Sequence, residues 1–420
     1  MRRQPGLPQS YGNAKVAVLD TIHGAAVIAK KMEERGLDAT ALEVYHHMPD
    51  VSGFDLIVAP VHLWPGNPVM AEARRMGRRT ITHHRAVGEI LESERDFEVF
   101  EVTGTHSKTS TALLLSRLLS ASSGKVVSHT TRGIELWDGG RSRVLGSGLS
   151  ITPGSVIKAF EAAGALHPKA IVSEVSLGGT GLADYNILTS FGGDYRIAGG
   201  TMWASTAKLQ MISLARPGTR LIANTDTRIA PDLSFGPGGT VRFSAHQIKI
   251  GEKKVPLVLG DDLDLESYTT AISAASAAAL AAGMDTASIS EALEGFDGFG
   301  GRMKKTVVDG IVIYDNSNSG LRVSGVERAL DLARGEGKLG LVVGEEAETV
   351  CEGVDVDRLV ELLRRRRQEI DLLVLVGERM EPYAQDLDTT TARDLDAGLD
   401  FVTSVLGPGD RLLSCVKCFR

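Results

Sequence analysis

A short segment in the first third of the chain combines the side chains and the backbone setting that phosphate binding requires. It follows the apolar strand pattern of Phe97–Val102 and precedes the helical pattern of Thr111–Ser120. In such a position, backbone N–H groups and a helix N-terminus can surround phosphate groups. Lys108 would neutralise phosphate charge, and the hydroxyl of Thr109 would bind Mg²⁺. The residues expected to bind ATP in this loop are Thr103, Gly104, Thr105, His106, Ser107, Lys108, Thr109 and Ser110.

The loop departs from the general phosphate-binding pattern at two positions. Glycine is expected at positions 102 and 107, where this chain has Val102 and Ser107. Serine fits an ordinary backbone angle, whereas a left-handed angle would cost roughly 1 kcal/mol. The alternative is a Ser/Thr-rich helix cap with an unrelated lysine. The order of strand, loop, Lys-Thr pair and helix argues against that alternative.

Length and composition limit the classes of protein that the chain can belong to. Its 420 residues predict two or three domains, and 43% hydrophobic with 24% charged residues is typical of a globular protein. A net charge of −7 without a basic patch argues against nucleic-acid binding. No apolar run has the length of a membrane span, and the basic start Met1–Pro5 has no apolar stretch behind it. We therefore expect a cytoplasmic protein with no membrane partner.

Three cysteines, Cys351, Cys415 and Cys418, form no disulfide framework, which agrees with a reducing compartment. The Cys415–Cys418 spacing is found in metal sites, but a second pair is missing. We interpret it as a buried strand cysteine followed by a terminal one.

Alternating strand and helix patterns predict an α/β fold in three parts. Residues 1–96 contain apolar strand patterns at Lys15–Asp20 and Leu56–Pro60, separated by helical patterns. Residues 97–300 contain the phosphate loop, further buried strands, and an Ala-rich stretch at Ala271–Gly283 that reads as a closely packed internal helix. Residues 301–420 again alternate between strands and helices.

The segment TGTHSKTS resembles the TGTxGKT[ST] loop of the Mur ligases and of folylpolyglutamate synthase. The resemblance implies a Rossmann-like N-terminal substrate domain, a P-loop ATPase central domain and a Rossmann-like C-terminal domain. Further similarities are spread along the chain. They are found at Ser173-Glu174-Val175-Ser176, at Lys208 after Asp194-Tyr195, at Asn224-Thr225-Asp226, at Gly301-Arg302 and at Asp315.

The resemblance assigns roles to these residues. Glu174 would bind Mg²⁺ with Thr109, and a carbamylated Lys208 would be a further anionic ligand. Asn224 and Asp315 would contact the nucleotide, and Arg302 would stabilise charge on the transferring phosphoryl group. Catalysis would therefore depend on Lys108, Glu174, Lys208 and Arg302. Two alternatives remain open, since Glu174 could be an ion-paired strand-end residue and Lys208 a solvated helix lysine.

Several departures from the Mur pattern point to a special subfamily. Tyr195 and Asn318 replace histidines, and Tyr268 stands near the position of an adenine-contacting asparagine, where we expect stacking on the base. The C-terminal end, CVKCFR, lacks the usual final motif, and the motif for recognising a free amino acid is absent. These features resemble the Mur-like coenzyme F430 synthetase subfamily of methanogenic archaea.

This second resemblance implies a specific reaction. ATP would activate a propionate of a nickel seco-tetrapyrrole as an acyl phosphate, and a carbon of the same molecule would then close a ring. The alternative is a Mur-type peptide ligase adding an amino acid to a carrier such as a pseudomurein precursor. A nucleotide-binding scaffold protein is a third possibility, disfavoured by the joint presence of the catalytic residues. Monomer and homodimer both remain open.

Residues for the substrate are less clearly marked. Six of the ten histidines, among them His62, lie in residues 1–96, and they could form a tetrapyrrole-binding face. We favour surface and loop histidines instead, because their spacing fits no simple metal motif. Arg132 and Arg196 are candidate carboxylate anchors, since guanidinium groups pair with carboxylates in a bidentate manner. Either could equally be a surface arginine.

Overall fold

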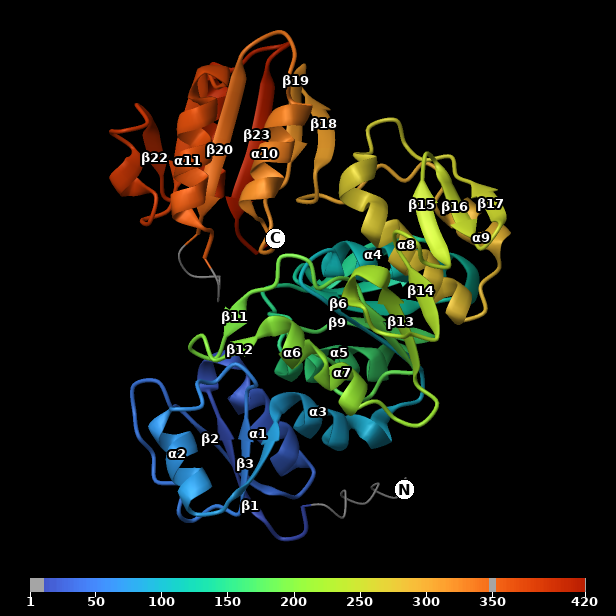
Figure 1. Cartoon of the computed structure of the whole chain (residues 1–420), viewed down its shortest axis with the longest axis vertical. Helices are drawn as coiled ribbons and strands as arrows, with labels where there is room; N and C mark the ends of the chain where they lie inside the picture. Colours follow the sequence, from blue (N-terminus) through green and yellow to red (C-terminus); the bar gives the residue numbers. More distant parts are fainter. Residues whose placement is uncertain (1–10, 347–352, 420) are drawn as a thin grey trace. The chain divides into compact units, whose positions relative to one another are not determined.

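The computed structural model describes residues 11–346 and 353–419, so Met1–Pro5 and Cys351 lie outside the described residues. By its internal contacts the chain divides into two compact units. The first comprises residues 1–257 and 269–293, and the second comprises residues 258–268 and 294–420. Three main sheets carry the fold (Figure 1). The predicted α/β class is confirmed, whereas the domain boundaries at residues 96 and 300 stay a prediction.

The first sheet is parallel, with the strand order β2-β1-β3-β4. Its strands are β1 (Lys15–Leu19), β2 (Asp38–Leu42), β3 (Leu56–Ala59) and β4 (Arg79–Thr82). The helices between and after them are η1 (Thr21–His23), α1 (Ala25–Glu34), α2 (Pro68–Arg75), α3 (His83–Leu91) and η2 (Glu92–Glu94). This is the expected β-α-β alternation.

The second sheet has eleven strands in the order β17-β16-β15-β14-β13-β10-β5-β9-β6-β7-β8. Its parallel centre consists of β13 (Arg220–Asn224), β10 (Tyr185–Leu188), β5 (Glu98–Thr103), β9 (Ala170–Glu174) and β6 (Val126–Thr130). The outer strands are β7 (Gly133–Asp138), β8 (Arg141–Gly146), β14 (Leu233–Phe235), β15 (Val241–Ser244), β16 (Gln247–Ile250) and β17 (Lys253–Pro256). Among the outer strands, β14 and β15 continue the parallel pairing, whereas β16, β17, β7 and β8 add antiparallel pairing at the two ends.

Helices of the central region include α4 (Lys108–Ser123), α5 (Pro153–Leu166), α6 (Ala204–Lys208), α7 (Gln210–Ser213), η3 (Thr225–Thr227), α8 (Leu265–Ala281) and α9 (Thr286–Ala292). A two-stranded ribbon, β11 (Arg196–Ile197) with β12 (Met202–Trp203), precedes α6. The alanines of α8 are buried, so the expected internal helix is confirmed. None of the helices in the described part of the chain is long and apolar enough to cross a membrane.

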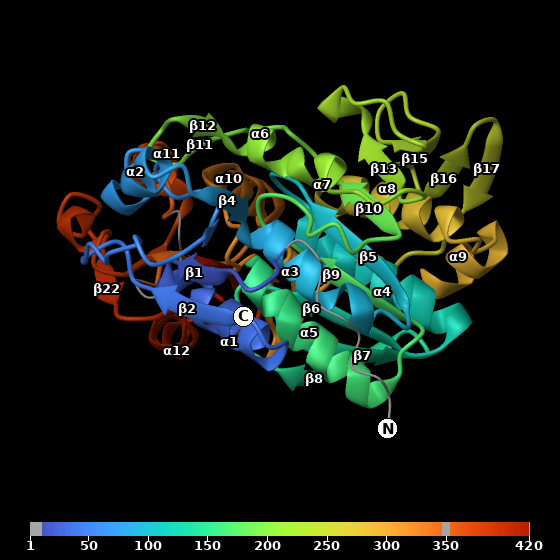
Figure 2. The same ribbon diagram turned by 90° about the horizontal axis from the view of Figure 1, so that it is seen from below.

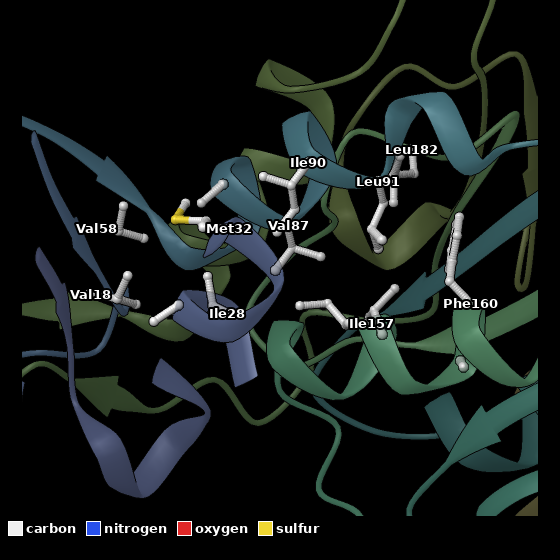
Figure 3. Packing of buried hydrophobic residues seen from close by; sticks show 14 of the residues in the cluster. Val18, Ile28, Met32, Val58, Val87, Ile90, Leu91, Ile157, Phe160 and Leu182 are labelled. Carbon is white, nitrogen blue, oxygen red and sulfur yellow. The ribbon is translucent and has the colours of Figure 1, made fainter. Parts of the chain in front are cut away.

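One apolar cluster joins the first sheet to the central region. Val18 and Met32 of the first sheet and α1 belong to the same buried cluster as Val87 of α3 and Ile157 and Phe160 of α5 (Figure 3). Figure 2 shows α1 next to α5. Burying a side chain of this size contributes about 1.5–3 kcal/mol. The core is therefore continuous across the expected boundary at residue 96.

The sheet of the second unit has the order β18-β19-β23-β20-β21-β22. Its strands are β18 (Lys304–Val308), β19 (Ile311–Asp315), β20 (Leu339–Glu345), β21 (Leu372–Val376), β22 (Thr390–Ala392) and β23 (Arg411–Lys417), and only β18 pairs in an antiparallel manner. Helices α10 (Val323–Leu332), α11 (Val356–Arg366) and α12 (Leu395–Val405) pack on it, with η4 (Arg367–Glu369) and η5 (Glu381–Tyr383) in the connections. Cys415 is buried on β23, as predicted, and Cys418 is buried as well.

Candidate active site

The phosphate loop joins β5 to α4 and is held against the end of β10. Gly104 has φ 147°, and a Cβ at this position would overlap the hydroxyl of Thr189. The Thr189 hydroxyl donates a hydrogen bond to the carbonyl of His106 at 2.6 Å. The first turn of α4 begins at Lys108, directly after the loop. The predicted order of strand, loop and helix is confirmed, and the positive end of the α4 dipole faces the loop.

Ser107 adopts the strained conformation that the sequence left open. Its φ of 60° and ψ of 6° lie in the left-handed region, at the N-cap of α4. The Ser107 hydroxyl lies 3.1 Å from Nδ1 of His106. Because glycine adopts this conformation without a steric penalty, the backbone still has the shape that a glycine-containing loop would give it.

Replacing Ser107 should reveal this backbone strain as a change in stability. We expect Ser107→Gly to unfold with a free energy about 1 kcal/mol higher than Ser107→Ala, because both lose the hydroxyl and only glycine relieves the positive φ. Chemical unfolding of the nucleotide-free protein measures the difference. Equal stability of the two variants would contradict a left-handed Ser107.

A hydroxyl, a carboxylate and an ammonium group meet at the start of α4. The Thr109 hydroxyl donates to Glu174 Oε2 at 2.7 Å, and Lys108 Nζ lies 3.8 Å from Glu174 Oε1. Glu174 ends β9, which pairs directly with β5, and its register partner is Val102. Glu174 is 1% exposed, whereas the side chain of Lys108 retains 19%. The sheet thus brings Glu174 next to the consecutive pair Lys108 and Thr109, from which it is distant in sequence, and Lys108 keeps access to a ligand.

The donor atoms at this point suit Mg²⁺. Magnesium prefers oxygen ligands and usually keeps several waters and phosphate oxygens in its coordination shell. Thr109 and Glu174 supply a hydroxyl and a carboxylate side by side, and the Thr131 hydroxyl lies 3.4 Å from that of Thr109. Glu174 and Thr109 would therefore hold the ion. The alternative of an ion-paired strand-end residue stays open, since Lys108 also lies 3.8 Å from Glu174, and metal binding stays a prediction.

Asn224 supports the loop indirectly. It ends β13, and its side-chain amide donates to the carbonyl of Thr189 at 2.9 Å. Two residues later, Asp226 accepts a hydrogen bond from the hydroxyl of Ser190. Asn224 is 5% exposed, so its observed contacts serve to hold the end of β10. Direct contact between Asn224 and the nucleotide stays a prediction.

Lys208 is buried rather than solvated. It ends α6, is 2% exposed, and its Nζ lies 5.3 Å from the centre of the Tyr195 ring. The alternative of a solvated helix lysine is therefore wrong. Burial lowers the pKa of neighbouring His84 to about 4, and the positive charge of Lys208 acts in the same direction. Carbamylation of Lys208 stays a prediction.

The two candidate carboxylate anchors have different surroundings. Arg132 forms an ion pair with Glu135 at 3.0 Å, so its guanidinium already has an anionic partner. Arg196 is exposed, and its guanidinium stacks 4.0 Å above the ring of Trp203. Of the two, Arg196 is the one that presents its charge to solvent. Their roles in substrate binding stay predictions.

The expectation of surface and loop histidines is only partly correct. His46 and His47 are exposed, but His83 and His84 are 1% and 3% exposed. Burial lowers the pKa of His83 to about 3, so both buried rings are neutral near pH 7. His62 lies 3.3 Å from a carboxylate oxygen of Asp20. This contact could not be predicted from sequence, because Asp20 follows β1 and His62 follows β3.

In the second unit, the residues predicted to serve the nucleotide lie together. The Arg302 guanidinium donates to the side-chain oxygen of Asn318 at 2.7 Å, and the Gly301 N–H donates to Asp315 at 2.8 Å. Asn318, which replaces the family histidine, also donates to the carbonyl of Gly301 at 2.7 Å. These bonds fix the position of Arg302 next to the end of β19.

Tyr268 lies in an aromatic cluster of the second unit. It is 1% exposed, its hydroxyl accepts a hydrogen bond from the N–H of Phe299 at 2.7 Å, and its ring contacts Phe296 edge-on. A ring covered in this way offers no face for adenine to stack on. The expected stacking of adenine on Tyr268 does not fit this burial.

One buried acid was not anticipated from the sequence. Glu101 lies on β5 and is fully buried, and it accepts hydrogen bonds from the N–H and the hydroxyl of Thr180. Burial raises its pKa to about 6, and the Thr180 bonds oppose this shift. The feature of the sequence that could have indicated this buried acid is a charged residue within an otherwise apolar strand pattern.

The raised pKa of Glu101 predicts a pH-dependent stability. The folded protein holds the proton more tightly than the unfolded chain, so this stabilisation is complete below about pH 4.5 and is lost as the pH rises through about 6. We expect Glu101→Gln to gain about 2 kcal/mol relative to the wild type between pH 4.5 and 8, at about 1.4 kcal/mol per pKa unit. Unfolding free energies across this range test it. The matched variant Glu98→Gln, on the same strand but partly exposed, should not show the same gain.

The sheets and the phosphate loop together have the architecture of the Mur ligases. Solved structures of this type share the fold. A pseudomurein peptide ligase type C from Methanothermus fervidus superposes with a TM-score of 0.53 at 14% identity, covering 96% of each chain. A bifunctional folylpolyglutamate synthase/dihydrofolate synthase with Mn, AMPPNP and L-glutamate bound gives a TM-score of 0.58 at 16% identity, covering 80% of this chain and 91% of that one.

Sequence comparison narrows the class further. Residues 305–418 match the family model for the C-terminal domain of coenzyme F430 synthetase CfbE. The coenzyme F(430) synthetase of Methanosarcina acetivorans is 36% identical over an alignment of 468 positions, which covers 97% of this chain and 99% of that protein. The chain belongs to the coenzyme F430 synthetase family. Both the Mur resemblance and its subfamily are thereby confirmed.

Proposed function

We propose that the protein uses ATP and Mg²⁺ to activate a propionate carboxylate of a nickel seco-tetrapyrrole and then closes a carbocyclic ring. A carboxylate oxygen attacks the γ-phosphorus of ATP, and ADP leaves. A carbon of the same molecule then attacks the acyl carbon, loses its proton, and phosphate leaves. The proposal rests on family membership together with one observation, the contact of Thr109, Glu174 and Lys108 at the start of α4.

These residues offset the repulsion between two anionic reactants. Lys108 would place its ammonium group against the phosphates, and the α4 N-terminus adds N–H donors. Bound Mg²⁺ would supply further positive charge to the phosphate oxygens. In the second unit, Arg302 and Asp315 are proposed to serve the transferring phosphoryl group and the nucleotide, and Lys208, if carbamylated, would support the metal.

Exposed apolar side chains of the first sheet favour a large, flat substrate. Ile22, Met48 and Trp64 are 63%, 75% and 51% exposed, and they follow β1, β2 and β3 at the carboxyl edge of the first sheet. Ligands of open α/β sheets bind at this edge. A macrocycle could cover these side chains, and Arg196 with Trp203 offers a cation for its carboxylates.

The reaction itself tests the proposal. With ATP, Mg²⁺ and the nickel seco-tetrapyrrole acid, and no amino acid, we expect phosphate release and a product lighter than the acid by one water. The same tetrapyrrole with the reacting propionate esterified is the matched control and should release none. Phosphate release that requires an added amino acid would overturn the proposal and favour a peptide ligase.

A further inference from the structure

A second cluster of ligand atoms lies in the first sheet, outside the phosphate loop. It consists of Asp20, His23 and His62. Asp20 directly follows β1, His23 ends η1, and His62 comes soon after β3. Because β1 and β3 are neighbours in a parallel sheet, the loops that follow them meet at the same edge.

The three ligand atoms form a small triangle. His23 Nδ1 lies 2.7 Å from Asp20 Oδ2, and His62 Nε2 lies 3.3 Å from the same oxygen. The two histidine nitrogens are 3.4 Å apart. Two imidazole nitrogens and one carboxylate oxygen thus lie within 3.4 Å of one another.

We propose that Asp20, His23 and His62 bind one divalent transition-metal ion of the zinc type. Bonds of about 2.0–2.1 Å to a tetrahedral ion place the ligand atoms about 3.3–3.4 Å apart. Two of the three edges already have this length, and only the His23–Asp20 edge must open by a fraction of an ångström. Imidazole with carboxylate is a donor set that zinc and its neighbours accept.

The surroundings of Asp20 resemble the support that metal ligands receive. The carboxylate is fully buried, and its Oδ1 accepts N–H bonds from Ile22 and His23 at 3.1 Å. The Tyr45 hydroxyl donates to Oδ2 at 2.8 Å. Outer hydrogen bonds of this kind orient a metal-binding carboxylate. The side chains of His23 and His62 retain 19% and 27% exposure, so a fourth position is accessible from solvent.

The geometry favours a free ion over the metal of a bound macrocycle. A tetrapyrrole occupies four positions around its metal with ring nitrogens, which leaves room for one protein ligand on each face. Three converging donors on one side suit an ion that has no such ring. The inference is therefore independent of the proposed reaction, and it can fail or hold without it.

Cobalt(II) is the probe, because tetrahedral cobalt absorbs visible light far more strongly than hexahydrated cobalt. The full-length protein is titrated with Co²⁺ without ATP, and with excess Mg²⁺ to occupy the magnesium site. We expect one equivalent to bind with a tetrahedral spectrum that lacks thiolate bands, and Zn²⁺ to displace it. His23→Gln and His62→Gln should weaken binding at least about tenfold. Asp20→Asn should also weaken Co²⁺ binding at least about tenfold. The backbone should be unchanged, since Asn adopts the positive φ of 79° found at this position.

The matched control is the double variant His46→Gln/His47→Gln, which removes two exposed histidines from the loop after β2. It should bind Co²⁺ like the wild type, and thermal unfolding without metal confirms that each variant is folded. If Asp20→Asn does not fold, the partly exposed His62 still decides the question. The inference would be overturned if the wild type gave no tetrahedral spectrum, or if both single histidine variants kept that spectrum. It would also be overturned if the protein bound only a metallated tetrapyrrole.

Discussion

Lys108→Ala should reduce kcat at least about a hundredfold while leaving the fold intact. The ammonium group is the cation next to Glu174 and lies at the N-terminus of α4, where the phosphates are proposed to bind. Removing one group that stabilises developing charge commonly lowers kcat by about 10²–10³. Phosphate release with the nickel seco-tetrapyrrole acid measures this effect, and ATP binding measured separately should also weaken.

The control for this variant is Lys125→Ala. Lys125 is an exposed lysine just beyond the other end of α4, so its removal changes the net charge equally. It should retain wild-type turnover. Near-normal turnover of Lys108→Ala would remove the loop from the mechanism, whatever the substrate is.

Glu174→Gln should be comparably damaging, and the loss should depend on magnesium. Glutamine keeps the shape and can still accept the Thr109 hydrogen bond, but it lacks the charge that holds a cation. Because a metal ion contributes several kcal/mol to stabilising transition-state charge, we expect kcat to fall about a hundredfold or more. The Mg²⁺ concentration for half-maximal rate should rise about tenfold or more.

A magnesium titration of the steady-state rate separates the two effects. Glu161→Gln, which removes an exposed carboxylate from α5, should leave both values unchanged. Thr109→Val should shift the magnesium requirement in the same direction, whereas Thr109→Ser keeps the hydroxyl and should not. An unchanged magnesium requirement in Glu174→Gln would exclude this carboxylate as a metal ligand.

The phosphate site could be anticipated from sequence because its geometry is local. The strand, the loop and the Lys108-Thr109 pair are consecutive, and a parallel sheet brings the ends of neighbouring strands to one edge. Glu174 was added through the resemblance to the Mur ligases, and the structure places it at the end of the neighbouring strand β9. The backbone angle of Ser107 could not be read in the same way, since serine is compatible with two conformations and the contacts around the loop select one.

The side chains whose surroundings could not be foreseen depend on packing between distant segments. For Lys208 the sequence left open both a metal ligand and a solvated helix lysine, and only the fold shows that Tyr195 and the surrounding chain cover it. The triangle of Asp20, His23 and His62 spans two loops whose spacing matches no metal motif. Only the pairing of β1 with β3 makes these residues neighbours.

The apolar cluster that unites α1, α3 and α5 has a consequence for how this enzyme can diversify. Residues 1–96 share this interior with α5, so they cannot be exchanged as a separate unit, since a cut near residue 96 would leave side chains such as Val87 and Ile157 without partners. If the first sheet binds the substrate, as proposed, new specificity would arise by replacing residues in the loops after its strands. Those loops can vary while the shared interior stays constant.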